Sequence, residues 1–216
     1  MPFREVNAKM VEAAVRPGQT MFSQRGAMLA YRGEVSFTPN VQGGQGGLMS
    51  MIGRRVADEA TPLMTVEGDG TVLFGHGGHH VHVVGLTGET LYVEADRLLA
   101  FDGTLRQGTM FMGAQGGVMG MVRGQATGQG LFTTTLQGHG SAAVMAHGGV
   151  FELQVTPQRP VHVDPQAYVA HRGDLRNRLS TALGWRDMVG RGSGEAFQLE
   201  LSGSGTVYVQ ASEEKL

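Results

Sequence analysis

The sequence contains no cysteine, little charge and few lysines. The absence of cysteine excludes disulfide bonds, thiolate zinc sites, iron–sulfur clusters and thiol nucleophiles. Charged residues make up 17% of the chain against roughly 25% in ordinary domains, and 17 basic and 19 acidic side chains give a net charge of −2. Only Lys9 and Lys215 are lysines, and the arginines are scattered. Because the basic patch of a nucleic-acid-binding protein is missing, we expect no nucleic acid among the partners.

Long hydrophobic runs are also missing. The longest ones, such as Ala142–Ala146, have about five residues, whereas a transmembrane helix needs about 20. The N-terminal stretch has neither the apolar region of a signal peptide nor the Arg- and Ser-rich composition of a transit peptide. We therefore expect a soluble, cytoplasmic protein with no transmembrane segment.

Glycine, by contrast, is abundant, at 35 of 216 residues. With only seven prolines, the combined Gly and Pro content stays below the roughly 25–30% at which an aperiodic chain is disordered. A hydrophobic content of 41% is enough for one sizeable core. We predict a single domain over residues 1–216.

The sequence resembles itself at a spacing of 70 residues. Three segments align without gaps and share apolar positions as well as an alanine and a glycine: Pro17–Val35, Thr87–Leu105 and Pro157–Leu175, with Ala30, Ala100 and Ala170 in register and Gly33, Gly103 and Gly173 in register. Self-similarity at a fixed period is the signature of an internal repeat. We predict three pseudo-repeats, at about 1–74, 75–144 and 145–216.

A second recurring module lies between these copies. Gly43–Ile52 returns as Gly113–Val122 at the same offset. Each copy leads to a Gly-x-Gly element, which also occurs a third time: Gly68–Gly70, Gly138–Gly140 and Gly203–Gly205. Because glycine adopts positive φ without steric cost, we interpret these elements as turns that link strands.

Local patterns favour strands. Apolar and polar residues alternate in Leu91–Glu94, Val161–Asp164 and Phe197–Leu201, as expected for strands with one buried face. Many short strands with frequent glycines predict an all-β sandwich or barrel. Short helical segments are expected in two places: over 175–185, where leucine recurs every four residues, and in the Gly-Met module.

Four motifs resemble the AIM24 family, formerly a domain of unknown function. They are RPGQTMFSQRGAMLAYRGEVSF, LYVEADRLLAFDGTL, VHVDPQAYVAHRGDL and GSGTVYVQAS, and the likeness covers almost the whole chain. The resemblance implies a TRAP-like β-sandwich, related to the tryptophan-responsive RNA-binding attenuator, and no particular reaction. RNA binding is not carried over, because fold likeness alone does not transfer function and the basic edge has no counterpart here. The lack of a transit peptide suits a bacterial, cytoplasmic member.

One histidine cluster has metal-ligand chemistry. It is the segment His76–His82, in which His80 and His82 would project from the same face of a strand and could share a transition metal. A cupin-like site would need a carboxylate a few residues further on, and Glu89 comes too late for that spacing. The alternative interpretation is a glycine turn followed by two exposed strand histidines.

The Gly-Met modules offer a candidate contact surface. Their apolar residues have the spacing of a short amphipathic helical turn: Leu48, Met49, Met51 and Ile52 in the first copy, Val118, Met119, Met121 and Val122 in the second. Two such turns, hinged by glycines and flanked by arginines, could contact a protein partner, a second subunit or an anionic membrane surface. The alternative is that both turns cap the ends of the β core.

Catalytic motifs are absent: no serine stands in G-x-S-x-G, and no phosphate-binding P-loop is present. The sequence thus favours a non-enzymatic binding or scaffold protein without a cofactor, acting through protein–protein contacts with an unknown partner or by self-association. Two alternatives remain, a cupin-like metal-binding protein that uses His80 and His82 and a peripheral membrane protein that uses the Gly-Met turns.

Overall fold

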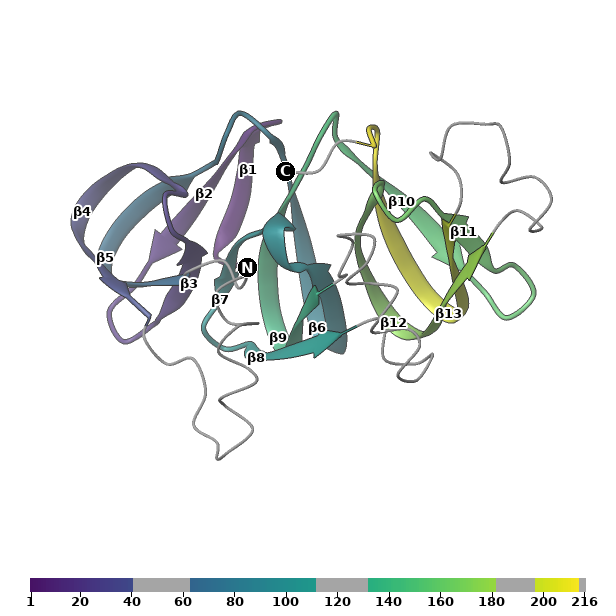
Figure 1. Ribbon diagram of the computed structural model, residues 1–216. Coiled ribbons are helices and arrows are strands. Elements are labelled where there is room, and N and C mark those ends of the chain that lie inside the picture. The colour runs from purple at the N-terminus through teal and green to yellow at the C-terminus, as the bar shows by residue number, and fades with distance from the viewer. Residues whose placement is uncertain (41–62, 112–131, 182–196, 214–216) are drawn as a thin grey trace, which may run out of the picture.

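The computed structural model describes residues 1–40, 63–111, 132–181 and 197–213 (Figure 1). Most of these residues form β-strands, and the one helix among them is the short 3₁₀-helix η1 (Ala95–Arg97). The predicted all-β fold is confirmed. No helix in this part of the chain is long and apolar enough to cross a bilayer.

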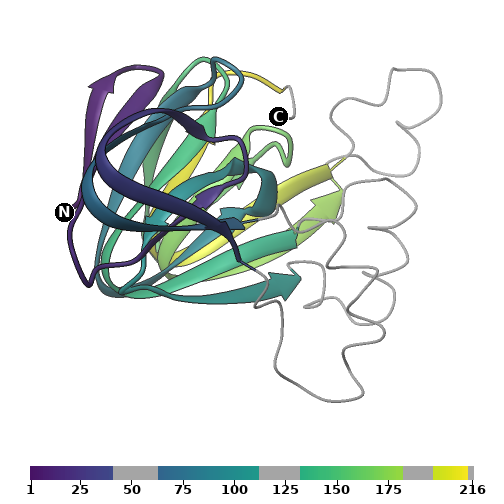
Figure 2. The same ribbon diagram turned by 90° about the vertical axis from the view of Figure 1, so that its left-hand side faces the viewer.

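The strands form three successive groups that lie in a row (Figure 1). The first group holds β1 (Phe3–Asn7), β2 (Met10–Val15), β3 (Met21–Gln24), β4 (Met28–Pro39) and β5 (Leu63–Phe74). The second holds β6 (His80–Glu94), β7 (Leu98–Asp102), β8 (Arg106–Phe111) and β9 (Phe132–Ala146). The third holds β10 (Val150–Val155), β11 (Val161–Val163), β12 (Tyr168–Thr181) and β13 (Phe197–Gln210). Seen along the row in Figure 2, the groups lie one behind the other.

Matching strands begin 70 residues apart. Strands β2, β6 and β10 begin at Met10, His80 and Val150, and strands β4, β7 and β12 begin at Met28, Leu98 and Tyr168. The thirteen strands of the described segments belong to one antiparallel sheet, which is open and does not close on itself. These strands therefore recur at the same spacing of 70 residues as the similar segments of the sequence.

Two short antiparallel ladders join the groups. Between the first and second group, β3 pairs with β7 in the register Met21↔Asp102, Phe22↔Phe101 and Ser23↔Ala100. Between the second and third group, the end of β6 pairs with β12 in the register Leu91↔Arg172, Tyr92↔His171 and Val93↔Ala170. Every residue of the second ladder stands 70 positions after its counterpart in the first. We call these ladders the first and second junctions.

The hydrophobic core follows the junctions. The first core cluster combines residues of the first group with residues of the second, among them Leu99 and Ala100 and also Val81, Ala143 and Met145. The second cluster combines residues of the second group with Tyr208 and with Val169 and Ala170, which stand 70 positions after Leu99 and Ala100. A third cluster lies within the third group, and among the described residues it holds six buried side chains against fourteen in each of the others. Each of the first two cores is therefore completed by the next group in the row.

The Gly-x-Gly elements are not turns, and this prediction was wrong. All three lie in the middle of long strands, β5, β9 and β13. Their first glycines, Gly68, Gly138 and Gly203, have φ of +133°, +135° and +123°. A Cβ on Gly68 would collide with the carbonyl oxygen of Glu34 on the neighbouring strand. Glycine is required here because two backbones approach closely, not because the chain reverses.

The predicted helix over 175–185 is also wrong as far as the structure describes it. Leu175–Thr181 belongs to β12 and pairs residue by residue with β13. Leu175 and the buried Asn177 alternate with the exposed Arg176 and Arg178. Leucines four residues apart lie on the same face of a strand, because four is a multiple of its period of two. The alternation of less exposed and exposed side chains between them is the pattern of a strand and not of a helix. By contrast, the strands predicted at Leu91–Glu94, Val161–Asp164 and Phe197–Leu201 are confirmed within β6, β11 and β13.

Candidate functional site

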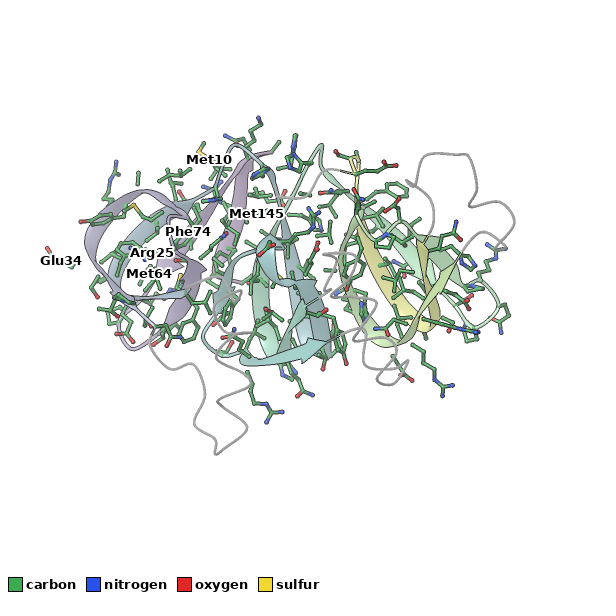
Figure 3. All side chains as sticks on the ribbon, viewed as in Figure 1. Met10, Arg25, Glu34, Met64, Phe74 and Met145 are labelled. Atoms are coloured by element: carbon green, nitrogen blue, oxygen red, sulfur yellow. The ribbon has the colours of Figure 1, made fainter. Side chains whose placement is uncertain are left out.

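The outer edge of β4 is the most exposed apolar strand segment in the described part of the chain. Met28, Leu29 and Tyr31 are 40%, 51% and 52% exposed. The residues 70 positions later on β7 and 140 positions later on β12 are at most 3% exposed: Leu98, Leu99 and Phe101, then Tyr168, Val169 and His171. Among the described strands, β4 pairs with β5 alone, and at this end of the molecule Glu34 projects outward (Figure 3). The same motif is thus buried in the second and third groups and exposed in the first.

Strand β11 is the matching free edge at the other end of the row. It stands 70 residues after the part of β6 that forms the second junction, and within the described residues it pairs with β13 alone. His162 is exposed, whereas Val163 is buried against the third core cluster. The segment that makes a junction in the first two groups therefore has no neighbouring group in the third.

Aromatic rings pair across each internal junction. Phe22 and Phe101 lie with ring centroids 5.1 Å apart at the first junction. Tyr92 and His171 stack at 4.5 Å, with an interplanar angle of 10°, at the matching positions of the second junction. Such cross-strand pairs stabilise neighbouring strands.

The second junction also buries a histidine. The Tyr168 hydroxyl lies 2.7 Å from Nδ1 of His171 and 3.2 Å from the carbonyl oxygen of Tyr92. Burial lowers the pKa of His171 from 6.5 to about 4 and raises the pKa of the Tyr168 hydroxyl well above 10. Both groups are therefore neutral at physiological pH, and His171 is suited to packing rather than to proton transfer.

A buried polar cluster surrounds Arg97, which is 1% exposed. Its Nε donates to the Glu94 carboxylate at 2.6 Å, its Nη1 donates to Oε1 of Gln210, and its Nη2 donates to the carbonyl oxygen of Gln166 at 3.3 Å. The side-chain amide of Gln210 in turn donates to the carbonyl oxygens of Gln166 and Ser212. The cluster ties η1 of the second group to β13 and the loop before β12. Its internal pairing points to a structural role.

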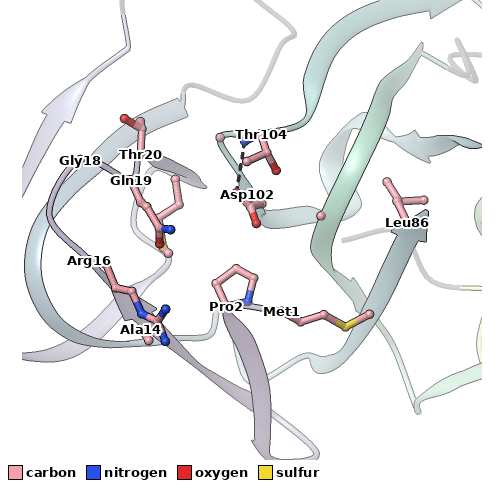
Figure 4. Close-up of a pocket in the computed structure, with 13 residues that line it drawn as sticks. Met1, Pro2, Ala14, Arg16, Gly18, Gln19, Thr20, Leu86, Asp102 and Thr104 are labelled. Carbon is pink, nitrogen blue, oxygen red and sulfur yellow. Dashed lines mark hydrogen bonds between the residues drawn. The ribbon is translucent and has the colours of Figure 1, made fainter. Parts of the chain in front are cut away.

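A cavity of about 600 Å³ opens between the first and second groups (Figure 4). Its lining includes Arg16, Asp102, Thr20 and Thr104 together with apolar residues near Met1. Thr20 donates to Glu67 at 2.7 Å, Thr104 donates to the carbonyl oxygen of His139 at 2.7 Å, and Asp102 accepts from the Thr104 backbone N–H at 3.1 Å. Among the described residues that line it there is no histidine and no second carboxylate. The charged side chains of the lining are thus Arg16 and Asp102, which do not form an acid–base pair.

The predicted metal ligands lie on one strand, but their neighbours differ from those of a metal site. His80 and His82 are half-buried on β6, on either side of the buried Val81. His82 lies between two carboxylates, with Nδ1 3.5 Å from Glu5 and Nε2 3.3 Å from Glu152. Within the described residues, no group of three or more His, Asp or Glu side chains is arranged to hold a metal ion. Metal binding by His80 and His82 stays a prediction.

Nearby, His79 packs edge to face on His147, with ring centroids 4.5 Å apart. Its pKa is lowered, first by partial burial and then by His147 and other neighbouring cations. The lowered pKa favours the neutral form of His79, as expected for a packed side chain.

Both Gly-Met turns lie outside the described residues. This applies to all eight predicted contact residues: Leu48, Met49, Met51, Ile52, Val118, Met119, Met121 and Val122. The exposed apolar edge that the structure shows, on β4, belongs to a motif that recurs in the sequence at a spacing of 70 residues. The sequence does not show which copy of this motif is exposed, because the same motif is buried in the other two groups.

Comparisons with known proteins agree with this description. The family model described as Mitochondrial biogenesis AIM24 matches residues 3–212. The crystal structure of protein SPYM3_0169 from Streptococcus pyogenes is similar in fold, with a TM-score of 0.72 and 20% sequence identity, over 97% of this chain and 92% of that one. No curated protein matches. Because the family match spans nearly the whole sequence, the chain belongs to the AIM24 family.

Proposed function

We propose that this protein is a non-enzymatic binding or scaffold protein that acts through protein–protein contacts at the outer edge of β4. The observation that carries the proposal is the exposure of Met28, Leu29 and Tyr31, whose counterparts in the other two groups are buried. The proposal keeps the TRAP-like fold that the family resemblance implies and the three pseudo-repeats that the self-similarity of the sequence predicts.

An edge of this kind favours association for two physical reasons. An edge strand presents backbone N–H and C=O groups that another strand can pair with. Exposed apolar side chains beside that edge release water when a partner covers them. Strand addition uses both effects at once, with backbone hydrogen bonds for affinity and side-chain pockets for specificity.

The charged and polar clusters among the described residues are paired internally, which supports a structural role for them. The Arg97 cluster is paired internally, and Arg172 donates to the carbonyl oxygen of Gly85 at 2.9 Å and to Glu89 at 3.3 Å. Burial keeps His171 neutral. None of these groups lines the cavity at the first junction.

Site-specific photo-crosslinking in cells tests the proposal. A benzophenone amino acid replaces Tyr31 in one variant and Val6 in the other. Val6 is a suitable control because it is 42% exposed on β1, away from both junctions. We expect a discrete protein adduct from position 31 and none from position 6. No adduct at position 31, or the same adducts from both positions, would overturn the proposal.

The two alternatives from the sequence remain predictions with tests of their own. Stoichiometric metal in untagged protein that is lost in His80→Ala and His82→Ala variants would favour the metal-binding alternative. Liposome flotation that is unchanged when Met49, Met51 and the two matching methionines become serine would count against the membrane alternative.

A further inference from the structure

We infer that the partner of the β4 edge is β11 of a second copy of this chain, so that copies join head to tail through a third junction. The inference rests on the proposed function and names the partner. Three independent features of the structure support it: the register of the junctions, the incomplete third core, and the aromatic pairs.

The register of the third junction follows from the first two. Each internal junction pairs three residues of one group with three residues of the next, at positions that shift together by 70. A further shift by 70 leads from Leu91–Val93 to Val161–Val163. No fourth group follows within the described residues, so the opposing segment comes from the first group of another copy, where Ala30–Arg32 corresponds to Ala100–Asp102 and Ala170–Arg172. The predicted register is Val161↔Arg32, His162↔Tyr31 and Val163↔Ala30, all antiparallel.

Backbone hydrogen bonding fits the same arrangement. At the first junction, the N–H of Gly103 donates to the carbonyl oxygen of Thr20 at 2.9 Å. The matching residues at the third junction are Gly33 and Pro160. Pro160 lacks an N–H but keeps the carbonyl that this bond requires.

The third core cluster lacks what the next group supplies elsewhere. Leu99 and Ala100 complete the first cluster, and Val169 and Ala170 complete the second. The matching residues for the third cluster are Leu29 and Ala30, both exposed at the other end of the chain. Docking a second copy would bury them against Val163 and its neighbours.

The aromatic pairs extend to the third junction. Phe22 pairs with Phe101, and Tyr92 pairs with His171. His162 and Tyr31 occupy the corresponding positions of the third junction. Both rings are exposed in a single copy, where Tyr31 contacts Phe37 of its own strand with ring centroids 5.6 Å apart.

The two edges belong to different copies because they lie at opposite ends of the row. In Figure 1, β4 lies at the far left and β11 at the right, and the sheet between them is open. An interface between two different surfaces of the same chain is heterologous, and it builds a closed ring or an open filament.

Disulfide trapping tests the predicted register, and the absence of natural cysteine makes it clean. Opposed residues of an antiparallel pair have Cα atoms roughly 4.5–5.5 Å apart, within the range that a disulfide spans. Tyr31→Cys and His162→Cys are made as separate variants, and both side chains are exposed, so the fold of each copy is retained. The control is Phe151→Cys, an exposed position on β10 outside the predicted junction.

Mixed under mild oxidation, Tyr31→Cys and His162→Cys should form a covalent dimer at least tenfold faster than Tyr31→Cys mixed with Phe151→Cys. The double variant Tyr31→Cys/His162→Cys should form a ladder of covalent oligomers or a covalent ring. No 31–162 product, or equal yields in both mixtures, would overturn the inference. A photo-crosslink from position 31 to a different protein would also overturn it while leaving the proposed function in place, whereas no adduct of any kind would refute both.

Discussion

Protonation of the buried His171 should limit the stability of the protein in acid. In the folded state its pKa is about 4, because burial disfavours the imidazolium, whereas in the unfolded chain it is close to 6.5. Below the unfolded-state pKa, the unfolded chain therefore binds a proton that the folded protein does not. Stability from this residue is complete above about pH 6.5 and is lost as the pH falls toward about 4.

The size of the effect follows from the shift. One pKa unit corresponds to about 1.4 kcal/mol, so lowering the pH from about 7.5 to about 4.5 should remove about 2.5 kcal/mol of unfolding free energy through His171 alone. The packing around the ring, with Tyr92 stacked on one face and the Tyr168 hydroxyl on Nδ1, leaves the imidazolium without a carboxylate among its described contacts.

The matched variant is His171→Phe, because phenylalanine stands at the corresponding position of the second group, as the fully buried Phe101. Unfolding by urea at both pH values gives the free energy for each protein. We expect the wild-type protein to lose about 2.5 kcal/mol more than the variant, since all other titrating groups are shared. Equal losses in the two proteins would refute the reasoning.

Three further predictions concern other parts of the fold. Replacing Arg97 by methionine should lower the unfolding free energy by about 3–5 kcal/mol, measured by urea denaturation, because the largely buried Glu94 carboxylate loses its cation; a loss below about 1 kcal/mol would contradict the structural role of the cluster. Gly68→Ala should cost at least about 2 kcal/mol more than Gly18→Ala in the same assay, since both glycines have positive φ but a Cβ meets a neighbouring backbone only at position 68; equal costs would remove the close-approach argument. Arg159→Glu should tighten self-association at least about fivefold in sedimentation experiments. Position 159 corresponds to Glu89 and Arg32 corresponds to Arg172, and the Glu89 carboxylate contacts Arg172, so a glutamate at 159 would face Arg32 at the predicted third junction. Weaker association would count against the predicted register.

Some of the fold could be predicted from the sequence because period-two alternation and a fixed repeat are local patterns. Alternation in Leu91–Glu94 and Phe197–Leu201 predicted strands, and strands are present there. The Gly-x-Gly elements misled because a glycine needed for close backbone approach looks, in sequence, like a glycine needed for a turn. Only the position of the neighbouring strand distinguishes the two cases.

The exposure of the β4 edge could not be predicted from the sequence for a related reason. Leu29 and Tyr31 have the same apolar character as Leu99 and Phe101, and their burial depends on whether another group precedes theirs in the row. The Arg97 cluster had no recurring signal either, because alanines stand at the matching positions 27 and 167. A residue that occurs in only one of the repeats, such as Arg97, leaves no recurring pattern from which its role could be predicted.

The most direct test of head-to-tail assembly through the β4 edge is the mass of the untagged protein in solution, measured by native mass spectrometry for the wild type, Leu29→Asp and Val6→Asp. Leu29 and Val6 are both exposed in a single copy, so neither change should unfold it. We expect the wild type and Val6→Asp to have the mass of several copies, whereas Leu29→Asp should have the mass of one. A single-copy mass for the wild type, or an undiminished assembly in Leu29→Asp, would contradict it.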